Sequence, residues 1–103
     1  MKLNLLIVDD EPLHVKIAAE LLQKDYNISI AIGAKEALEV LQNNKIDMIL
    51  LDINMPEMDG FELAAILKNK DRYKDTPIIF VSADESPEYL QKAIESGGVD
   101  YIV

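Results

Sequence analysis

The amino-acid sequence predicts an α/β domain in which helices cover both faces of a five-stranded parallel sheet, a doubly wound architecture. Short runs of Ile, Leu and Val without polar alternation recur along the chain, which is typical of strands buried on both faces. Segments with helical periodicity separate these runs. Strict alternation of strand and helix implies right-handed crossovers between parallel strands. We therefore expect one domain over residues 1–103, with strand order 2-1-3-4-5.

Three strands are predicted strongly and two more weakly. The strong ones are the apolar runs at residues 5–8, 48–51 and 78–81. The weaker ones are residues 28–32, where alternation is partial, and residues 99–103, which have a β-branched and aromatic character.

Four helices are predicted between the strands. Apolar residues recur at three- and four-residue spacing in each segment, the period of a helix with one apolar face. Pro12 suits the first turn of the first helix, and the pair Gly97 and Gly98 ends the fourth. The apolar positions are Leu13, Ile17 and Leu21; Ala37, Leu38 and Leu41; Phe61, Ala64 and Leu67; and Leu90, Ala93 and Ile94.

Charge and composition exclude several classes of function. Ten Lys and Arg against nineteen Asp and Glu give a net charge of −9, whose field repels nucleic acids and anionic membrane surfaces. The chain has no Cys and a single His, His14, which excludes disulfides, thiolate nucleophiles and multi-histidine metal clusters. No apolar run has the length of a membrane span or a signal-peptide core. We expect a cytoplasmic protein, in which any metal is a hard ion on oxygen ligands.

Acidic side chains gather at the predicted carboxyl ends of neighbouring strands, where ligand sites of open α/β sheets lie. Asp9 and Asp10 follow the first strand, Asp52 ends the third and Ser82 follows the fourth. Carboxylates placed so close together repel one another unless a cation neutralises them. Mg²⁺ characteristically uses one or two protein carboxylates, several waters and a phosphate oxygen. The sequence therefore predicts a magnesium site at this edge.

A carboxylate held beside Mg²⁺ can act as a nucleophile toward phosphorus and form an aspartyl-phosphate. Asp52 is the candidate for this role, while the Ser82 hydroxyl could donate to a phosphoryl oxygen and the Asn54 carbonyl could face the metal. Other readings stay open from the residues alone. Asp9 and Asp10 could cap the following helix, and Ser82 could be an ordinary turn residue.

Four motifs in register resemble the receiver domain of two-component response regulators, over the whole length of the chain. They are LIVDDEP at the end of the first strand, ILLDINMPEMDG around the third, PIIFVSA in the fourth and GGVDYIV leading into the fifth. The resemblance implies a flavodoxin-like fold and phosphoryl transfer from a histidine kinase or phosphotransfer protein. It also implies a phosphoacceptor that catalyses only its own phosphorylation and dephosphorylation, and is not otherwise an enzyme.

The resemblance implies roles for individual acidic and amide residues. Asp52 resembles the phosphoacceptor, and Asp9 and Asp10 resemble the acidic pair that binds Mg²⁺ together with Asp52. Asn54 resembles the residue that gives its backbone carbonyl to the metal. Asn54 and Asp84 also fall at two variable positions that tune how fast the phosphoryl group is lost.

Two further residues resemble the family's switch. Ser82 resembles the hydroxyl that moves toward the phosphoryl group, and Tyr101 resembles the aromatic residue that swings inward with it. Their movement would change the surface around the fourth strand, the fourth helix and the fifth strand. Without the resemblance, Tyr101 reads more simply as an aromatic residue packing on a sheet edge.

The sequence departs from the family pattern at its C-terminus. The family places a Lys shortly after the aromatic residue of the fifth strand, and this sequence ends at Val103, just where that Lys is expected. The family's fifth helix is missing as well. We therefore expect a chain truncated in or just after strand five, whose uncovered apolar sheet face could pair with a second copy in a homodimer.

Two rival functions follow from the same residues. A Mg²⁺-dependent aspartyl-phosphate phosphatase resembles this chain in chemistry, but it places its nucleophile at the end of the first strand with a second Asp two residues on, where this chain has Glu11. A receiver-like module that docks or dimerises without being phosphorylated is the second rival, and it stays open because the expected Lys is missing.

Overall fold

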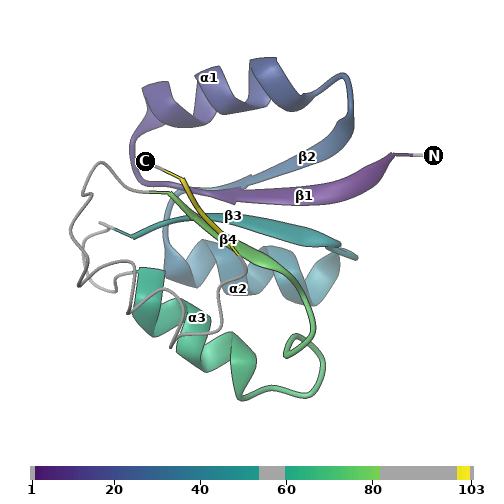
Figure 1. The fold of residues 1–103 in the computed structure, drawn as a ribbon, viewed down its shortest axis with the longest axis vertical. Helices are drawn as coiled ribbons and strands as arrows, with labels where there is room; N and C mark the ends of the chain where they lie inside the picture. The colour runs from purple at the N-terminus through teal and green to yellow at the C-terminus, as the bar shows by residue number, and fades with distance from the viewer. Residues whose placement is uncertain (1, 54–59, 82–99, 103) are drawn as a thin grey trace.

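The computed structural model describes residues 2–53, 60–81 and 100–102, which form a parallel sheet flanked by helices (Figure 1). The strand order is β2-β1-β3-β4-β5, and every neighbouring pair is parallel. This confirms the predicted fold class and strand order. The elements are β1 (Leu3–Val8), α1 (Pro12–Leu22), β2 (Tyr26–Ala31), α2 (Ala34–Asn43), β3 (Met48–Asp52), α3 (Gly60–Lys68), β4 (Ile78–Val81) and β5 (Asp100–Ile102).

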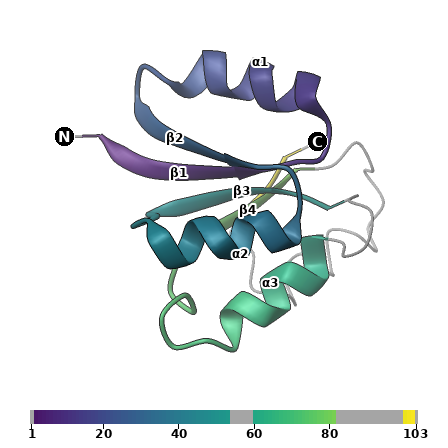
Figure 2. The same ribbon diagram turned by 180° about the vertical axis from the view of Figure 1, so that it is seen from behind.

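The strand β1 lies inside the sheet between β2 and β3, where the direction of the crossovers changes. Ile7 of β1 pairs with Ile30 of β2 on one side and with Leu50 of β3 on the other. The crossover through α1 runs over one face of the sheet, whereas α2 and α3 lie on the opposite face (Figures 1 and 2). Crossovers to opposite faces leave a crevice outside the carboxyl ends of the central strands, here β1 and β3.

The main core fills the space between the sheet and the pair α2 and α3. Alternate strand residues enter it, because successive side chains of a strand point to opposite faces. Phe80 of β4 is fully buried and packs on Phe61 of α3, with ring centroids 5.1 Å apart in a tilted arrangement. The other members include Leu6, Val8, Ile49, Leu51, Ile53, Leu63, Leu67 and Ile78. This core fixes where β3 ends and α3 begins.

The opposite face of the sheet is covered less completely by α1. Leu5 and Ile7 of β1 are buried on the face opposite to the main core, and Val15 is the buried residue of α1. The periodic apolar residues of this helix point away from the protein instead: Leu13, Ile17 and Leu21 are 60%, 48% and 72% exposed. Helical periodicity was predicted correctly, but this apolar stripe is on the outer face.

The element bounds differ from the expectation at two strand starts. The run 78–81 matches β4 residue for residue, while β1 begins at Leu3 and β2 at Tyr26, each two residues earlier than predicted. Of the expected fifth strand, Asp100–Ile102 form β5, and residues 99 and 103 lie outside the described residues. Pro12 opens α1, as predicted. The fourth expected helix, around Leu90 and Ala93, lies outside the described residues. No helix in the described part is long and apolar enough to cross a membrane.

Candidate functional site

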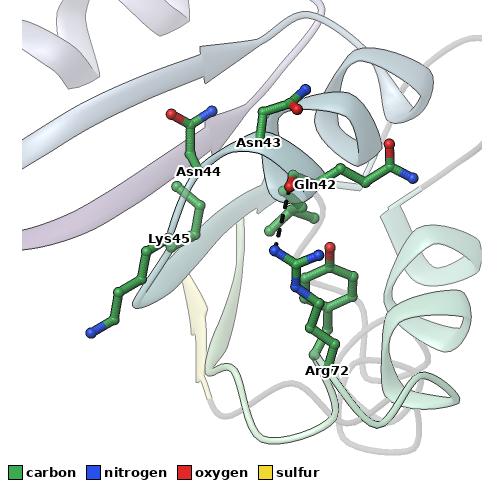
Figure 3. Close-up of a pocket in the computed structure, with 8 residues that line it drawn as sticks. Gln42, Asn43, Asn44, Lys45 and Arg72 are labelled. Carbon is green, nitrogen blue, oxygen red and sulfur yellow. Dashed lines mark hydrogen bonds between the residues drawn. The ribbon is translucent and has the colours of Figure 1, made fainter.

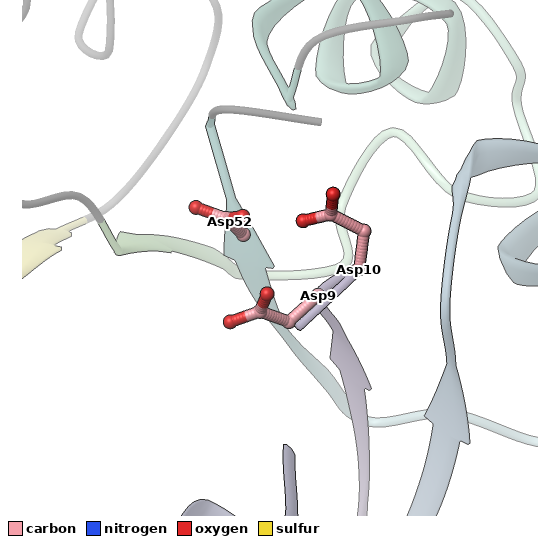
Figure 4. Close-up of side chains that lie close together, drawn as sticks. All are labelled: Asp9, Asp10 and Asp52. Atoms are coloured by element: carbon pink, nitrogen blue, oxygen red, sulfur yellow. The ribbon is translucent and has the colours of Figure 1, made fainter. Parts of the chain in front are cut away.

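Three carboxylates meet where β1 and β3 end. Asp9 and Asp10 directly follow β1, and Asp52 is the last residue of β3. One carboxylate oxygen from each residue lies within 4.8 Å of the other two, and the three side chains converge on one another (Figure 4). The convergence predicted from strand order is therefore observed.

The register of the sheet produces this convergence. Val8 of β1 pairs with Leu51 of β3, so the residues that follow each of them are neighbours at the same edge. The backbone N–H of Asp9 donates to the carbonyl oxygen of Ala31 at 3.1 Å, which continues the pairing with β2 for one more residue. The position of Asp9 is thus set by both neighbouring strands.

Helix α3 begins in close contact with the end of β3. The N–H of Gly60 donates to the carbonyl oxygen of Ile53 at 2.8 Å. A β-carbon at Gly60 would lie 2.4 Å from the Asp52 carbonyl oxygen and 2.9 Å from the Ile53 α-carbon. Only glycine allows this approach without movement of the backbone. Sequence analysis did not predict this contact with Asp52.

The Asp9 side chain is held on both of its oxygens. Asp9 is only 9% exposed, its Oδ1 accepts the backbone N–H of Glu11 at 2.9 Å, and its Oδ2 lies 3.4 Å from Nδ1 of His14. Glu11 is the N-cap residue of α1 and makes no side-chain cap hydrogen bond. Asp9 therefore organises the turn that leads into the helix, whereas the N-cap position that was considered for Asp9 or Asp10 is occupied by Glu11.

The donor set fits a hard divalent cation. All three candidate ligand atoms are carboxylate oxygens, the type that Mg²⁺ prefers. Oxygens bound to one Mg²⁺ at about 2.1 Å can be at most about 4.2 Å apart, so the observed group, with separations up to 4.8 Å, needs little closure. Three negative charges at this distance repel one another until a cation neutralises them.

A second concave feature lies at the other end of the sheet (Figure 3). This groove of about 410 Å³ is formed by the end of α2, the following loop and the segment after α3. The Arg72 guanidinium donates to the carbonyl oxygen of Gln42 at 3.4 Å and lies 5.4 Å from the centre of the Tyr73 ring. Among the described residues that line the groove none carries a carboxylate, so its chemistry is unlike that of the acidic cluster.

Comparison with known proteins decides what kind of domain carries this acidic cluster. The family model described as the response regulator receiver domain matches residues 5–103. The chain belongs to this family. The resemblance inferred from the four sequence motifs is thereby confirmed.

Curated relatives of this receiver domain are longer proteins. A probable cyclic di-GMP phosphodiesterase of Vibrio cholerae is 40% identical over 99 residues, which make up 96% of this chain and 22% of that protein. The two-component response regulator ARR10 of Arabidopsis thaliana is 35% identical over 104 residues, covering 98% of this chain and 18% of that protein. The chain thus spans about a fifth of the length of these relatives.

Solved structures share the receiver fold over nearly the whole chain. The Vibrio cholerae chemotaxis protein CheY4 superposes with a TM-score of 0.94 at 32% identity, covering 100% of this chain and 87% of that chain. The N-terminal domain of a response regulator receiver protein from Methanoculleus marisnigri gives a TM-score of 0.87 at 33% identity, covering 96% of this chain and 81% of that chain.

The remaining receiver-domain residues are described only in part. Asn54, Ser82 and Asp84 lie outside the described residues. The backbone of Tyr101 pairs with Phe80 across β4 and β5, which places it two strands from Asp52. The acidic part of the predicted site is therefore assembled in the structure, and the switch residues stay predictions.

Sequence analysis also missed the contact of His14 with Asp9. The single imidazole served there only to exclude a multi-histidine cluster, and its side chain is 66% exposed. The available signal was its distance along the chain: a residue in the first turn of a helix can reach back to the acidic residue that ends the preceding strand.

Proposed function

We propose that this receiver domain accepts a phosphoryl group on Asp52 from the phosphohistidine of a histidine kinase or phosphotransfer protein. The proposal includes one Mg²⁺ ion held by Asp9, Asp10, Asp52 and the backbone carbonyl of Asn54. The observation that carries it is the meeting of three carboxylates from two neighbouring strand ends within 4.8 Å, at the ligand-binding edge of a receiver fold.

The chemistry assigned to Asp52 is nucleophilic. One of its carboxylate oxygens forms a bond to phosphorus while the bond from phosphorus to the donor's imidazole nitrogen breaks, and the imidazole leaves with that electron pair. When bound, Mg²⁺ supplies positive charge that offsets the charge of the carboxylates and the phosphoryl oxygens. Asp9 and Asp10 orient that charge beside Asp52, because both follow β1 directly.

The consequence for signalling is a change of surface. An aspartyl-phosphate at Asp52 adds negative charge and acceptor oxygens. In this proposal the Ser82 hydroxyl moves toward the phosphoryl group, and the Tyr101 ring swings inward with it. The affected surface is that of β4, the segment after it and β5. The surface change is the output, since the domain is proposed to catalyse only its own phosphorylation and dephosphorylation.

The proposal also covers the extent, the location and the partners of the domain. We infer that residues 1–103 act as one receiver unit, in the cytoplasm, where a histidine kinase or phosphotransfer protein can reach Asp52. A net charge of −9 makes nucleic acid and anionic membranes unsuitable partners for this unit.

A second function is favoured by one observation, the outward apolar stripe on α1. Leu13, Ile17 and Leu21 are exposed on the outer face of this helix. Apolar patches of this kind commonly mark association surfaces. We propose a homodimer through this face, as a docking role that does not depend on phosphorylation.

Intact-mass measurement after incubation with acetyl phosphate tests the primary function. A phosphate-sized mass gain is expected for wild type with Mg²⁺, and no gain for wild type with chelator or for Asp52→Asn. A Mg²⁺-independent gain, or an equal gain in Asp52→Asn, would contradict the assignment. Asp75→Asn is a matched control, because Asp75 is an exposed carboxylate in the segment after α3.

A further inference from the structure

The two acidic residues that follow β1 are held very differently. Asp9 is nearly buried, and its two oxygens face the Glu11 backbone N–H at 2.9 Å and His14 Nδ1 at 3.4 Å. Asp10 is exposed, and none of the hydrogen bonds or ion pairs found among the described residues involves its side chain. One carboxylate of the pair is therefore fixed before a cation arrives, and the other is not.

From this contrast we propose that His14 is a positioning residue for the metal site: its imidazole holds the Asp9 carboxylate in the orientation that binds the cation. The inference rests on the proposed function, because it assumes that the acidic cluster binds Mg²⁺. It goes beyond that function by assigning a role to a residue on α1 that supplies no ligand to the cluster.

His14 contacts Asp9 but is not a member of the carboxylate cluster. The cluster whose ligand atoms all lie within 4.8 Å of one another contains Asp9, Asp10 and Asp52, while His14 makes its contact on Asp9 Oδ2 alone. Groups that hydrogen-bond to a metal ligand fix its orientation, and their loss typically weakens metal binding by about 10- to 100-fold. The His14 side chain is largely exposed to water and its contact is long, at 3.4 Å, so we expect an effect below that range.

Two contacts on different oxygens hold the Asp9 carboxylate more firmly than the Glu11 contact alone. The torsion about the terminal bond of a carboxylate is broad. The N–H of Glu11 restrains it at Oδ1, and the contact with His14 restrains it further at Oδ2. Because α1 begins at Pro12, His14 lies in the first turn of the helix, directly after the turn that Asp9 organises.

Metal affinity of two His14 variants tests the inference in the unphosphorylated protein. His14→Leu removes the donor, whereas His14→Asn keeps an amide N–H donor near the position of Nδ1. Binding of Mn²⁺ is followed by electron paramagnetic resonance and Mg²⁺ by competition, at the same pH for all proteins. We expect Kd to rise about 3- to 10-fold in His14→Leu and to stay within about 2-fold of wild type in His14→Asn.

The outcomes separate this inference from the proposed function. If wild type binds the ion and Asp9→Asn does not, the metal site exists. In that case, binding by His14→Leu that is as tight as or tighter than in wild type overturns the role of His14. A wild type that binds no more tightly than Asp9→Asn overturns the metal site itself. An equal loss in both His14 variants also overturns the inference, because it would show that the donor near Nδ1 is not what matters.

A second measurement reports the contact directly. The chain contains one His, so its ring nitrogens give a single set of signals in a long-range ¹H–¹⁵N spectrum. The contact with Asp9 Oδ2 requires the proton on Nδ1, and we expect this tautomer to dominate in wild type and to lose ground in Asp9→Asn. A ring that keeps the same tautomer ratio in both proteins would overturn the inference, and unchanged urea midpoints verify that the variants are folded.

Discussion

Gly60 lies directly against the backbone of Asp52, with the site of a missing β-carbon only 2.4 Å from the Asp52 carbonyl oxygen. The contact couples the first residue of α3 to the last residue of β3. It explains why the helix that follows the proposed phosphoacceptor begins with glycine, since any larger residue must push the two backbones apart.

Gly60→Ala is therefore expected to lower the free energy of unfolding by about 1–3 kcal/mol, the usual range for overpacking, and to slow phosphorylation of Asp52. Urea unfolding and the rate of mass gain with acetyl phosphate measure the two effects. Gly33→Ala is the control, because nothing lies within 4 Å of a β-carbon there. If Gly60→Ala were as stable as Gly33→Ala, the backbones at residues 52 and 60 could separate without loss of stability, which would contradict the prediction.

The main core predicts a sharp difference between two leucines. Leu51 is fully buried between the sheet and the helices, so Leu51→Ala should lower the free energy of unfolding by about 2–5 kcal/mol. Leu21 is 72% exposed on α1, and Leu21→Ala should change it by less than about 0.5 kcal/mol. Urea denaturation of the two variants measures both values, and similar losses would contradict the assignment of the stripe to the outer face.

Magnesium should change the thermal stability of the protein through the acidic cluster. Without a cation, Asp52→Asn should raise Tm, because it removes repulsion of roughly 1 kcal/mol per neighbouring carboxylate. With Mg²⁺ at about 100 times its Kd, wild type should gain about 2.7 kcal/mol. Calorimetry of wild type and Asp52→Asn, each with and without Mg²⁺, measures whether the order of their Tm values reverses when Mg²⁺ is added. Equal Mg²⁺ shifts in wild type and in Asp52→Asn would place the ion elsewhere.

The outer stripe of α1 gives a prediction for association. If two copies pair through this face, the mass of wild type in light scattering should rise with concentration toward twice 11.6 kDa. Ile17→Lys should stay monomeric, because a charge in the middle of the patch must be desolvated on pairing. The added Lys reduces the net negative charge, so the loss cannot be ascribed to greater repulsion. A wild type that is monomeric at every concentration contradicts the homodimer.

Much of the fold could be predicted because the central strands carry an unambiguous signal. The runs around Leu6, Leu50 and Ile79 have no polar alternation, which only strands buried on both faces require. The start of β2 was predicted too late, because Tyr26 and Asn27 join the sheet by backbone pairing with Leu3 and Asn4 and need no apolar side chain for it.

The acidic cluster could also be predicted, since strand order alone brings Asp9 and Asp52 to one edge. What could not be predicted depends on three-dimensional contacts between short segments. Periodicity marks the apolar side of α1 but does not reveal that Val15 faces inward and Ile17 outward. The approach of Gly60 to Asp52 and the reach of His14 to Asp9 depend on how each helix begins, which residue spacing does not fix.

The central claim is that Asp52 is the phosphoacceptor, and chemical trapping tests it most directly. Wild type is phosphorylated with acetyl phosphate and Mg²⁺, reduced with borohydride, which converts an aspartyl-phosphate to homoserine, and digested for peptide mass spectrometry. The account predicts homoserine at position 52 alone, and no homoserine when a chelator is present during the incubation with acetyl phosphate. Homoserine at Asp9 or Asp10, or no reduced residue in a protein that has gained the mass of a phosphoryl group, would contradict it.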